Sequence, residues 1–447
     1  MDDGAALELE HARRASSALD YDRRALVQDA FFGLARARRT AHATALSLGG
    51  DAVTYGALAD WAAAVAERLG GGVAVAGVRC ARGFAAYAAV YGALASGAAY
   101  VPLAATSPEP RQRAMLEGAR ADALVVDGGA APGGFRGALV VVGRRPRTPP
   151  TTSPRPRRAP DDPVYVMYTS GSSGAPKGVV VPHGCLVARV AWLGDAFGHP
   201  RALCCKTSYA FGVSEWELHW PLAVGGTGVL APPGAERDPS ALARCLRASA
   251  CSHVFVVSSV LRLLVDDLAA APLPALSYVV QCGEALDGPL VERFYESVAG
   301  ADLANVYGPT EASMTAWVAP RTFRSAADVV LVGTPVKNAF VVVLRAGSLD
   351  AAPPGEAGEL CFGGILATGY VDGDAAAFPD APAGPLGRFV DAAPKVLGER
   401  RLYRTGDAAV RGADGSLRVA GRLDRQVKAC VQIKSSTRLQ CARIRMF

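Results

Sequence analysis

The fold is decided by the stretch Tyr168-Thr-Ser-Gly-Ser-Ser-Gly-Ala-Pro-Lys-Gly178, which overlaps the end of a short apolar run at residues 164–168. The run predicts a β-strand, and the stretch that follows combines glycines, hydroxyl groups and one lysine. Glycines let backbone N–H groups approach an anion closely, and successive N–H groups form a concave anion site. It is not a Walker A loop, because Lys177 stands between Pro176 and Gly178 rather than before a hydroxyl residue. We therefore predict a polyphosphate-binding loop; the alternative, a flexible Ser/Gly linker, needs neither the strand nor the Pro-Lys-Gly ending.

Helical and strand patterns alternate on both sides of this loop, as in α/β proteins with a largely parallel sheet. The predicted strands are residues 123–126, 138–142, 164–168, 253–257, 278–281 and 339–344. The predicted helices are residues 55–69, 214–223, 239–248 and 260–268. From about residue 329 onward the elements shorten and Gly-Pro turns become frequent, which predicts a more β-rich subdomain.

Composition and charge are those of a globular protein. The chain has 447 residues, of which 50% are apolar and 20% are charged, so a large core can form. The formal charge of +6 does not indicate nucleic-acid binding, because six arginines in one Pro-rich stretch equal the whole excess. These are Arg144, Arg145, Arg147, Arg155, Arg157 and Arg158. Such a run is typical of a solvated connector, the alternative being a phosphate-binding or partner-binding segment.

The cysteines and the N-terminus indicate an intracellular protein. The ten cysteines are scattered, with no C-x-x-C and no histidine cluster, which favours free thiols in a reducing compartment. The N-terminal residues lack the apolar core of a secretory signal. Residues 84–101 are apolar but interrupted by Gly92, Ser96 and Gly97, which predicts a buried helix running into a strand. We expect a cytoplasmic protein that binds neither nucleic acid nor membrane.

Seven segments resemble one enzyme family, in that family's order. Tyr168 to Gly178, with Val179-Val-Val-Pro-His183, resembles the phosphate loop of the adenylate-forming superfamily of acyl-CoA synthetases, amino-acid adenylation domains and luciferases. The other six are Val53-Thr-Tyr-Gly-Ala-Leu58, Leu94-Ala-Ser-Gly-Ala-Ala-Tyr-Val-Pro-Leu103, Asn305-Val-Tyr-Gly-Pro-Thr-Glu311, Gly358-Glu-Leu360 through Gly369-Tyr370, Tyr403-Arg-Thr-Gly-Asp407 and Gly421-Arg-Leu-Asp-Arg-Gln-Val-Lys428. They cover roughly residues 25 to 428. Trp216-Glu-Leu-His-Trp-Pro-Leu222 and Arg237-Asp238-Pro239 are most similar to the amino-acid adenylation domains of nonribosomal peptide synthetases.

The resemblance implies a fold and a reaction. The fold would be α/β, the large N-terminal lobe of the adenylate-forming fold, with two αβα-layered subdomains and a small β-rich subdomain. The reaction would join a carboxylate to the α-phosphate of ATP, releasing pyrophosphate and holding an acyl-adenylate. The partner acid would be small, and the acyl acceptor would be a carrier-protein domain or CoA. Two alternatives are an acyl-CoA synthetase and a non-catalytic nucleotide-binding remnant.

The resemblance also assigns nucleotide contacts. They fall on Thr169, Ser170, Gly171, Ser172, Ser173, Gly174, Lys177, Gly283, Glu284, Tyr307, Thr310, Asp407 and Arg422. Residues 169–177 would take the β- and γ-phosphates, Tyr307 would lie against adenine, and Gly283 and Glu284 would form part of the adenine pocket wall. Asp407 would accept both ribose hydroxyls, and Arg422 would donate to the ribose or phosphate side. Lys177, Thr310 and Glu311 would be catalytic, Thr310 on the α-phosphate and Glu311 by holding Mg2+, which prefers oxygen ligands.

The acid-binding side departs from the family pattern. Phe211-Gly-Val-Ser214 stands where the family's F-D-x-S supplies an aspartate for an amino acid's ammonium, and Gly212 takes the aspartate position. Because a buried ammonium needs a counter-charge, we expect a hydroxy, keto, aryl or β-amino acid. Alternatively, Glu215 supplies the charge, or the activity is lost or relaxed. The implied pocket is mainly apolar and is lined by Phe211, Gly212, Val213, Trp216, Val280, Cys282, Val306, Met314 and Thr315, with simple core packing as the alternative.

We expect an AMP-binding N-terminal domain at residues 25–420, a flexible Arg/Pro connector at 144–160 and a hinge remnant at 421–447. After Lys428 the family continues into a C-terminal lobe that carries a lysine for the reacting groups, and the residues from Ala429 onward do not match it. They are either a real short C-terminus or the product of a shifted reading frame or misplaced splice. Loss of a preorganised positive charge commonly costs about 10²-fold in rate, so we expect impaired turnover.

Overall fold

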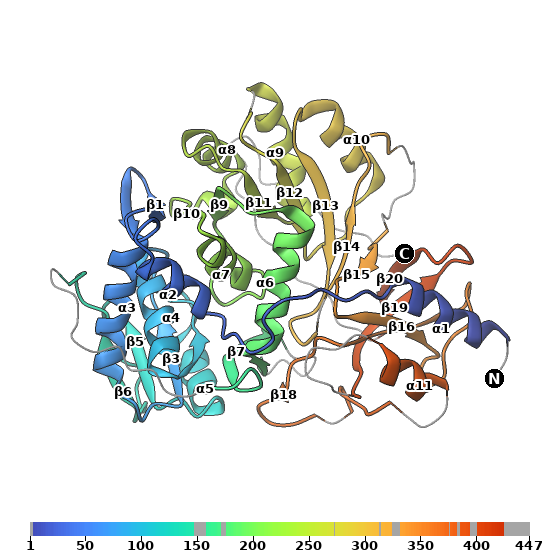
Figure 1. The fold of residues 1–447 in the computed structure, drawn as a ribbon, viewed down its shortest axis with the longest axis horizontal. Helices are drawn as coiled ribbons and strands as arrows, with labels where there is room; N and C mark the ends of the chain where they lie inside the picture. The colour runs from blue at the N-terminus through green and yellow to red at the C-terminus, as the bar shows by residue number, and fades with distance from the viewer. Residues whose placement is uncertain are drawn as a thin grey trace.

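The structure, a computed structural model, describes residues 3–146, 158–170, 176–271, 273–312, 314–323, 331–374, 376–381, 385–393 and 400–423. Gly171 to Gly174 of the predicted phosphate loop lie outside these residues. So do residues 147–157 of the predicted connector and residues 424–447 of the predicted hinge remnant. Three sheets carry the described part of the chain (Figure 1).

The first sheet has nine strands, and its central strands run parallel. In spatial order they are β15 (Thr334–Pro335), β14 (Thr315–Val318), β13 (Asp302–Tyr307), β12 (Tyr278–Cys282), β11 (His253–Val256), β9 (Ala202–Cys205), β10 (Thr227–Leu230), β1 (Thr44–Leu48) and β2 (Asp51–Thr54). Only β2, β14 and β15, at the two edges, pair antiparallel. Because parallel strands end at the same edge, the loops after β9, β12 and β13 open on one side of the sheet, where α/β proteins bind ligands.

The second sheet has seven strands, and the predicted phosphate loop belongs to it. In spatial order they are β18 (Gly369–Tyr370), β8 (Pro176–Pro182), β7 (Pro163–Ser170), β4 (Ala99–Pro102), β3 (Val75–Arg79), β5 (Ala123–Val126) and β6 (Ala138–Val141). β7 to β6 run parallel, whereas β8 and then β18 are added antiparallel at one edge. The loop therefore connects the two strands of a β-hairpin.

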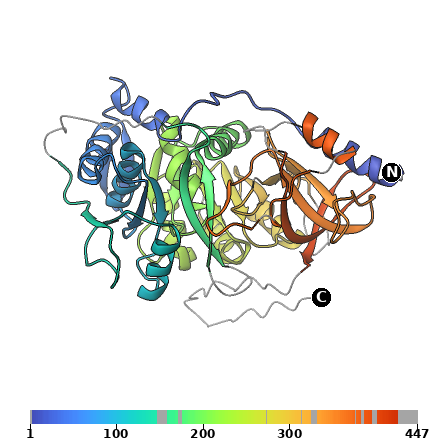
Figure 2. The same cartoon turned by 90° about the horizontal axis from the view of Figure 1, so that it is seen from below.

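Helices lie between the two large sheets and on their outer faces (Figures 1 and 2). The helices in the middle layer are α2 (Asp29–Arg36), α3 (Tyr55–Leu69), α4 (Phe84–Ser96), α6 (His183–Phe197) and α7 (Ser214–Val224). The outer helices are α5 (Glu109–Gly118) on the second sheet and η1 (Ala235–Arg237), α8 (Pro239–Ala248), α9 (Ser258–Ala270) and α10 (Gly288–Ser297) on the first. The predicted α/β fold with two layered subdomains is confirmed.

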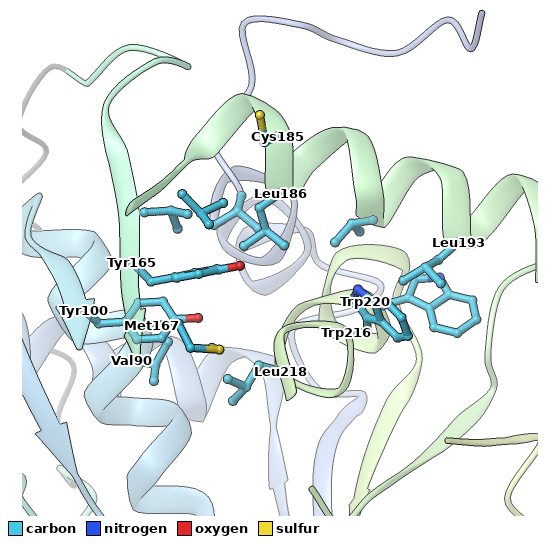
Figure 3. Packing of buried hydrophobic residues seen from close by; sticks show 14 of the residues in the cluster. Val90, Tyr100, Tyr165, Met167, Cys185, Leu186, Leu193, Trp216, Leu218 and Trp220 are labelled. Atoms are coloured by element: carbon cyan, nitrogen blue, oxygen red, sulfur yellow. The ribbon is translucent and has the colours of Figure 1, made fainter. Parts of the chain in front are cut away.

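Strands with two covered faces are apolar on both. In β12, Val280 packs into the middle layer and its neighbour Val279 packs under the outer helices, because successive side chains point to opposite faces. Figure 3 shows the middle layer, where Tyr165 and Tyr100 lie between their strands and α6, the helix that carries Leu186. The buried histidine His219 has hydrogen-bond partners there: its ring nitrogens lie 3.2 Å from the hydroxyls of Tyr91 and Tyr100. Burial lowers the pKa of His219 to about 3, so the ring is neutral in the core.

The third sheet is small and antiparallel throughout, which confirms the predicted β-rich subdomain. Its strands are β16 (Phe340–Leu344), β17 (Ala357–Gly363), β19 (Tyr403–Arg411) and β20 (Leu417–Arg422), in that order. The last helix, α11 (Pro385–Ala392), and the first, α1 (Asp3–Ala15), pack side by side against this sheet, as both views show.

One ion pair fastens α1 to the third sheet. Glu8 is fully buried and accepts hydrogen bonds from the backbone N of Val343, at 2.8 Å, and from Nε of Arg411, at 2.7 Å. Burial raises the pKa of Glu8, and Arg411 opposes that rise. Residues 16–28 then cross the molecule to α2 (Figure 2). The first helix thus contacts the strand that ends at Arg411, at the opposite end of the sequence.

Most predicted elements are present with small changes at their ends. The predicted helices 55–69 and 239–248 are α3 and α8 with the same bounds, and residues 84–101 form α4 and most of β4, as predicted. The predicted helix 260–268 is the longer α9, because the Glu284 carboxylate accepts the N–H of Ser259 and so completes its first turn. Across the described ranges, no helix has both the length and the apolar character needed to cross a bilayer.

Candidate functional site

The β7–β8 hairpin brings the two ends of the predicted phosphate loop together. Thr169 faces Lys177 in the antiparallel register, and Ser170 is the last residue of β7. The Lys177 side chain is 39% exposed, with Nζ 3.2 Å from Oδ2 of Asp374 and 5.1 Å from the ring centre of Tyr370. Within the described residues, Lys177 is thus a partly exposed cation that lies beside the half-buried Asp374 carboxylate and the face of the Tyr370 ring.

Glu311 lies beside the same hairpin, although it follows β13 of the first sheet. It is 6% exposed, and its Oε1 accepts hydrogen bonds from the hydroxyls of Tyr370, at 2.9 Å, and Thr169, at 3.4 Å. Burial raises the pKa of Glu311, while the Tyr370 and Thr169 hydroxyls and the charge of Lys177 lower it. Tyr370 reaches Glu311 because β18 pairs with β8, with Tyr370 opposite Val179.

Tyr307, Asp407 and Arg422 form one hydrogen-bonded group across two sheets. The Tyr307 hydroxyl donates to Oδ2 of Asp407, and Nη1 of Arg422 donates to Oδ1 at 3.0 Å. Asp407 and Arg422 are paired residues of β19 and β20, whereas Tyr307 ends β13. Burial, and then the Asp407 carboxylate, raise the pKa of Tyr307, so its hydroxyl keeps the proton that it donates.

The Glu359 carboxylate binds β19 just before Asp407. Glu359 of β17 accepts from the backbone N of Gly406, at 3.0 Å, and from Nε of Arg404, at 2.7 Å. Gly406 has a left-handed φ of +69°, and a Cβ there would lie 2.8 Å from Nη2 of Arg422. The glycine of the Tyr403-Arg-Thr-Gly-Asp407 segment is therefore required both by its backbone angle and by the close arginine.

Gly283 and Glu284 follow β12 at the same edge of the first sheet. Gly283 has a φ of +96°, which glycine adopts without strain. The Glu284 carboxylate accepts from the backbone N of Ser259, at 2.7 Å, and from its hydroxyl, at 2.9 Å. Glu284 is therefore occupied with the first turn of α9, and its part in an adenine pocket stays a prediction.

Gly212 lies against Thr310. An ideal Cβ at Gly212 would stand 3.0 Å from Oγ1 of Thr310, so the segment before α7 reaches the predicted catalytic segment. Phe211, by contrast, is 65% exposed. The other predicted pocket residues are half-buried or buried, and most belong to the large central core: Val213, Trp216, Val280, Cys282, Val306, Met314 and Thr315. Packing alone explains their burial, so their substrate contacts remain predictions.

Glu215 does not supply a counter-charge to a substrate, and that alternative is wrong. The residue is 2% exposed, and Oε1 accepts from Nη1 of Arg189 at 3.0 Å and from Nε1 of Trp216 at 2.9 Å. Oε2 accepts from the Tyr165 hydroxyl and, at 3.0 Å, again from Arg189. An arginine of α6 already neutralises this carboxylate inside the core.

The donor set around Glu311 fits Mg2+. Among the described residues, no cluster of three or more His, Cys, Asp or Glu side chains is arranged to hold a metal ion alone. Mg2+ typically takes one or two carboxylates, with water and substrate phosphates completing its octahedron. Glu311 is a buried carboxylate with the Thr169 hydroxyl beside it, next to the predicted phosphate loop. A single carboxylate with neighbouring oxygens therefore suits a metal that arrives with a nucleotide.

Comparison with known proteins shows the family to which the chain belongs. A family model described as AMP-binding enzyme matches residues 34–371. The phosphinothricin tripeptide synthetase PhsB of Streptomyces viridochromogenes is 37% identical over 413 residues, which are 88% of this chain and 33% of PhsB. Enterobactin synthase component F of Escherichia coli is 34% identical over 76% of this chain and 26% of its own length. The chain thus spans about a third or less of these relatives.

Solved structures show the same fold. The nonribosomal peptide synthetase FmoA3 in its AMPPNP-bound form superposes with a TM-score of 0.79 and 28% identity, over 93% of this chain and 45% of that one. The N-terminal subdomain of Klebsiella oxytoca NpsA, in complex with 3-hydroxybenzoyl-AMSN, gives a TM-score of 0.74 and 26% identity, over 89% of this chain and all of that one.

The three sheets form the same fold as the N-terminal subdomain of NpsA. The chain belongs to the AMP-binding enzyme family, and its relatives include nonribosomal peptide synthetases. Four residues around the site were not assigned a role from the sequence. Tyr370 and Glu359 were part of a matched segment, whereas Asp374 and Arg189 carried no local signal, because their partners are distant in the sequence.

Proposed function

We propose that this chain activates a carboxylic acid with ATP, forming an acyl-adenylate and releasing pyrophosphate. The observation that carries the proposal is the meeting of three distant segments. The β7–β8 hairpin contacts the segment after β13 through Thr169 and Glu311, and the end of β13 contacts β19 through Tyr307 and Asp407. A nucleoside triphosphate requires the groups found here. They are a loop with hydroxyls and a lysine, a carboxylate for a metal, and a second carboxylate beside an aromatic ring.

Each group has a part in the proposed reaction. Lys177 offsets negative charge on the leaving pyrophosphate, the hairpin hydroxyls donate hydrogen bonds to it, and Thr310 donates to the α-phosphate. Tyr307 lies against the adenine, and Asp407 accepts the ribose hydroxyls while Arg422 supports its charge. The carboxylate oxygen of the acid forms a bond to the α-phosphorus as the bond from that phosphorus to pyrophosphate breaks. Holding both reactants in line makes the transfer effectively unimolecular.

Glu311 is the residue we propose to hold Mg2+, which would neutralise phosphate charge. The chain's own contribution is to present that carboxylate already desolvated and oriented by Tyr370 and Thr169. Both of these hydroxyl partners are uncharged, so neither would compete with a cation for the Glu311 carboxylate.

The proposed acid lacks an α-ammonium group. Gly212 offers no carboxylate at the position where the family places an aspartate, and Glu215 is neutralised by Arg189. An ammonium would therefore lose its hydration without gaining a partner there. A hydroxy, keto or aryl acid, or a β-amino acid whose nitrogen lies elsewhere, fits this site better. NpsA, whose N-terminal subdomain is complexed with a 3-hydroxybenzoyl compound, supports an aryl acid.

The proposed acyl acceptor is a carrier-protein domain. Relatives such as enterobactin synthase component F are much longer than this chain, and NpsA has been fused artificially to a carrier domain named ThdA. A CoA thiol is the alternative acceptor. Incubating the acyl-adenylate with a phosphopantetheinylated carrier or with CoA, and weighing the products by mass spectrometry, distinguishes them.

Acid-dependent exchange of labelled pyrophosphate into ATP tests the proposed function. The acids are chosen in matched sets that share one side chain and differ only in an α-amino, α-hydroxy or α-keto group, with benzoates added. We expect the hydroxy, keto or aryl acids to exceed the amino acid by at least about tenfold, since each 1.4 kcal/mol is tenfold. The chain is assayed alone and joined to a C-terminal lobe of the family. If the chain binds ATP but catalyses no exchange with any of the acids, either alone or joined to the C-terminal lobe, a non-catalytic nucleotide-binding protein would be favoured.

Gly212→Asp is expected to shift the preference toward α-amino acids by about tenfold or more, because the new carboxylate pairs with the ammonium. Gly212→Ala is the matched control: it adds the same Cβ, 3.0 Å from the Thr310 hydroxyl, without the charge. The ratio of amino-acid to hydroxy-acid exchange is measured for both variants. Equal ratios in the two would show that residue 212 does not face the substrate's α-substituent.

A further inference from the structure

A buried guanidinium lies directly beneath the segment that carries Thr310 and Glu311. Arg189 of α6 is 2% exposed, and its Nη2 donates to the backbone carbonyl of Ala312 at 2.6 Å and to that of Thr310 at 3.3 Å. These two carbonyls belong to the residues on either side of Glu311. Arg189 therefore holds the peptide groups that flank the proposed metal carboxylate.

The second terminal nitrogen of the Arg189 guanidinium, Nη1, has partners on other elements. Nη1 of Arg189 donates to both oxygens of Glu215, each at 3.0 Å, and to the Tyr165 hydroxyl at 3.2 Å. Glu215 lies on α7, and Tyr165 lies on β7, the strand that continues to Thr169. Figure 3 shows Tyr165 and Trp216, two of the partners of Glu215, on either side of this part of the core. The guanidinium thus joins α6, α7 and the hairpin strand to the segment of Glu311.

Stability alone does not explain this arrangement. A buried ion pair recovers little more than the cost of desolvating its two charges, and apolar replacements are often as stable. What the pair does provide is fixed geometry, because a planar guanidinium presents several donors in a rigid fork. Here two of the acceptors are the Thr310 and Ala312 carbonyls, on either side of Glu311. With apolar side chains in place of the ion pair, these two carbonyls would lack donors.

We propose that Arg189, oriented by Glu215, is a positioning residue that sets the place of Glu311 for the metal that accompanies the nucleotide. The proposal rests on the proposed function, in which Glu311 holds Mg2+. Arg189 itself touches neither the metal nor the nucleotide. It acts through the Thr310 and Ala312 carbonyls, in the way that hydrogen-bond partners behind a metal ligand usually orient that ligand.

The same network reaches the acid-binding side. The backbone N of Glu215 donates to the Gly212 carbonyl at 3.1 Å, and Gly212 lies against the Thr310 hydroxyl. A shift of Glu215 would therefore move the start of α7 as well as the segment of Glu311. This continuity explains why an ion pair, rather than two apolar side chains, occupies the position: it fixes both sides of the site at once.

The test is the Mg2+ dependence of nucleotide binding, measured by calorimetry with a non-hydrolysable ATP analogue while Mg2+ is varied. The variant Arg189→Met/Glu215→Gln removes both charges, so neither is left buried alone, and Gln keeps an acceptor for Tyr165 and Trp216. We expect its Mg2+ midpoint to rise about 10- to 100-fold, the usual effect of losing a group that orients a metal ligand. Binding of the analogue without Mg2+ should change much less. Arg189→Lys keeps the charge pair but cannot span both carbonyls, and we expect an intermediate shift.

The matched control is Lys337→Met/Asp195→Asn. It removes an exposed ion pair of 2.8 Å whose acid lies on the same helix, α6, and should leave the Mg2+ midpoint unchanged. A folded Arg189→Met/Glu215→Gln protein with an unchanged midpoint overturns the positioning role while leaving the proposed function intact. If that protein does not fold, Arg189→Lys decides the question by the same criterion. If the unmodified chain binds the analogue with no dependence on Mg2+, both the role of Glu311 and this proposal fail.

Discussion

Asp407→Ala is expected to weaken ATP binding by about 10- to 100-fold, since hydrogen bonds to a charged group contribute about 1.5–3 kcal/mol. The carboxylate is the proposed acceptor for the ribose, and it also holds the Tyr307 hydroxyl and the Arg422 guanidinium. Its removal therefore takes away one ligand contact and loosens two neighbours. Calorimetric titration with ATP gives the dissociation constant directly, without need of turnover. Lys177→Ala should weaken binding by a smaller factor, because that side chain is partly exposed.

Asp414→Ala is the matched control for this variant. Asp414 lies in the turn between the same two strands, is exposed, and accepts hydrogen bonds from the backbone N and hydroxyl of Ser416, at 3.0 and 2.7 Å. ATP affinity should therefore be retained. If Asp407→Ala and Asp414→Ala bound ATP equally well, the nucleotide site would have to lie elsewhere.

Glu8→Ala should lower the free energy of unfolding by about 3–5 kcal/mol, the usual effect of removing one partner of a buried ion pair. Arg411 would stay in the core without a counter-charge, and the Val343 N–H would lose its acceptor. Scanning calorimetry measures the loss as a lower melting temperature. Glu8→Gln keeps an acceptor but not the charge, so we expect a smaller loss.

The control for Glu8→Ala lies on the same helix. Glu10 pairs with Arg13 and Arg14 at the surface, both at 2.9 Å, and its removal should leave the melting temperature nearly unchanged. Equal melting temperatures for Glu8→Ala and Glu10→Ala would mean that α1 does not stabilise the third sheet.

Local pattern was sufficient to predict most of the fold. Helices 55–69 and 239–248 carry their apolar residues at helical spacing and begin at a Thr or Asp cap, so their ends are encoded within a few residues. The strand before the phosphate loop was equally predictable, from its apolar run at residues 164–168. Its hairpin partner was not predicted, because the first three residues of β8, Pro176-Lys-Gly178, belong to the phosphate-loop motif, and β18, which completes that edge, has only two residues. Strand order of this kind is set by packing between layers rather than by local sequence.

The site was predicted as a set of residues but not as a set of contacts. Thr169, Glu311, Tyr307 and Asp407 could be named from their segments, yet the hydrogen bonds that join them span 100 residues or more. Glu215 shows the limit most clearly. Its place beside Gly212 in the sequence made it a plausible counter-charge, whereas its carboxylate turns into the core to meet Arg189, 26 positions earlier. No spacing rule connects two charges on different helices.

The attachment of α1 has a consequence for the order in which the protein forms during synthesis. Glu8 and Arg411 are 403 positions apart, so the first helix leaves the ribosome long before its strand exists. At about 5–20 residues per second, that interval is about 20–80 seconds. The two large sheets, whose strands up to β15 precede the third sheet, have time to form first. We therefore expect α1 to be among the last elements to dock. It would pack onto the third sheet after the two large sheets have formed.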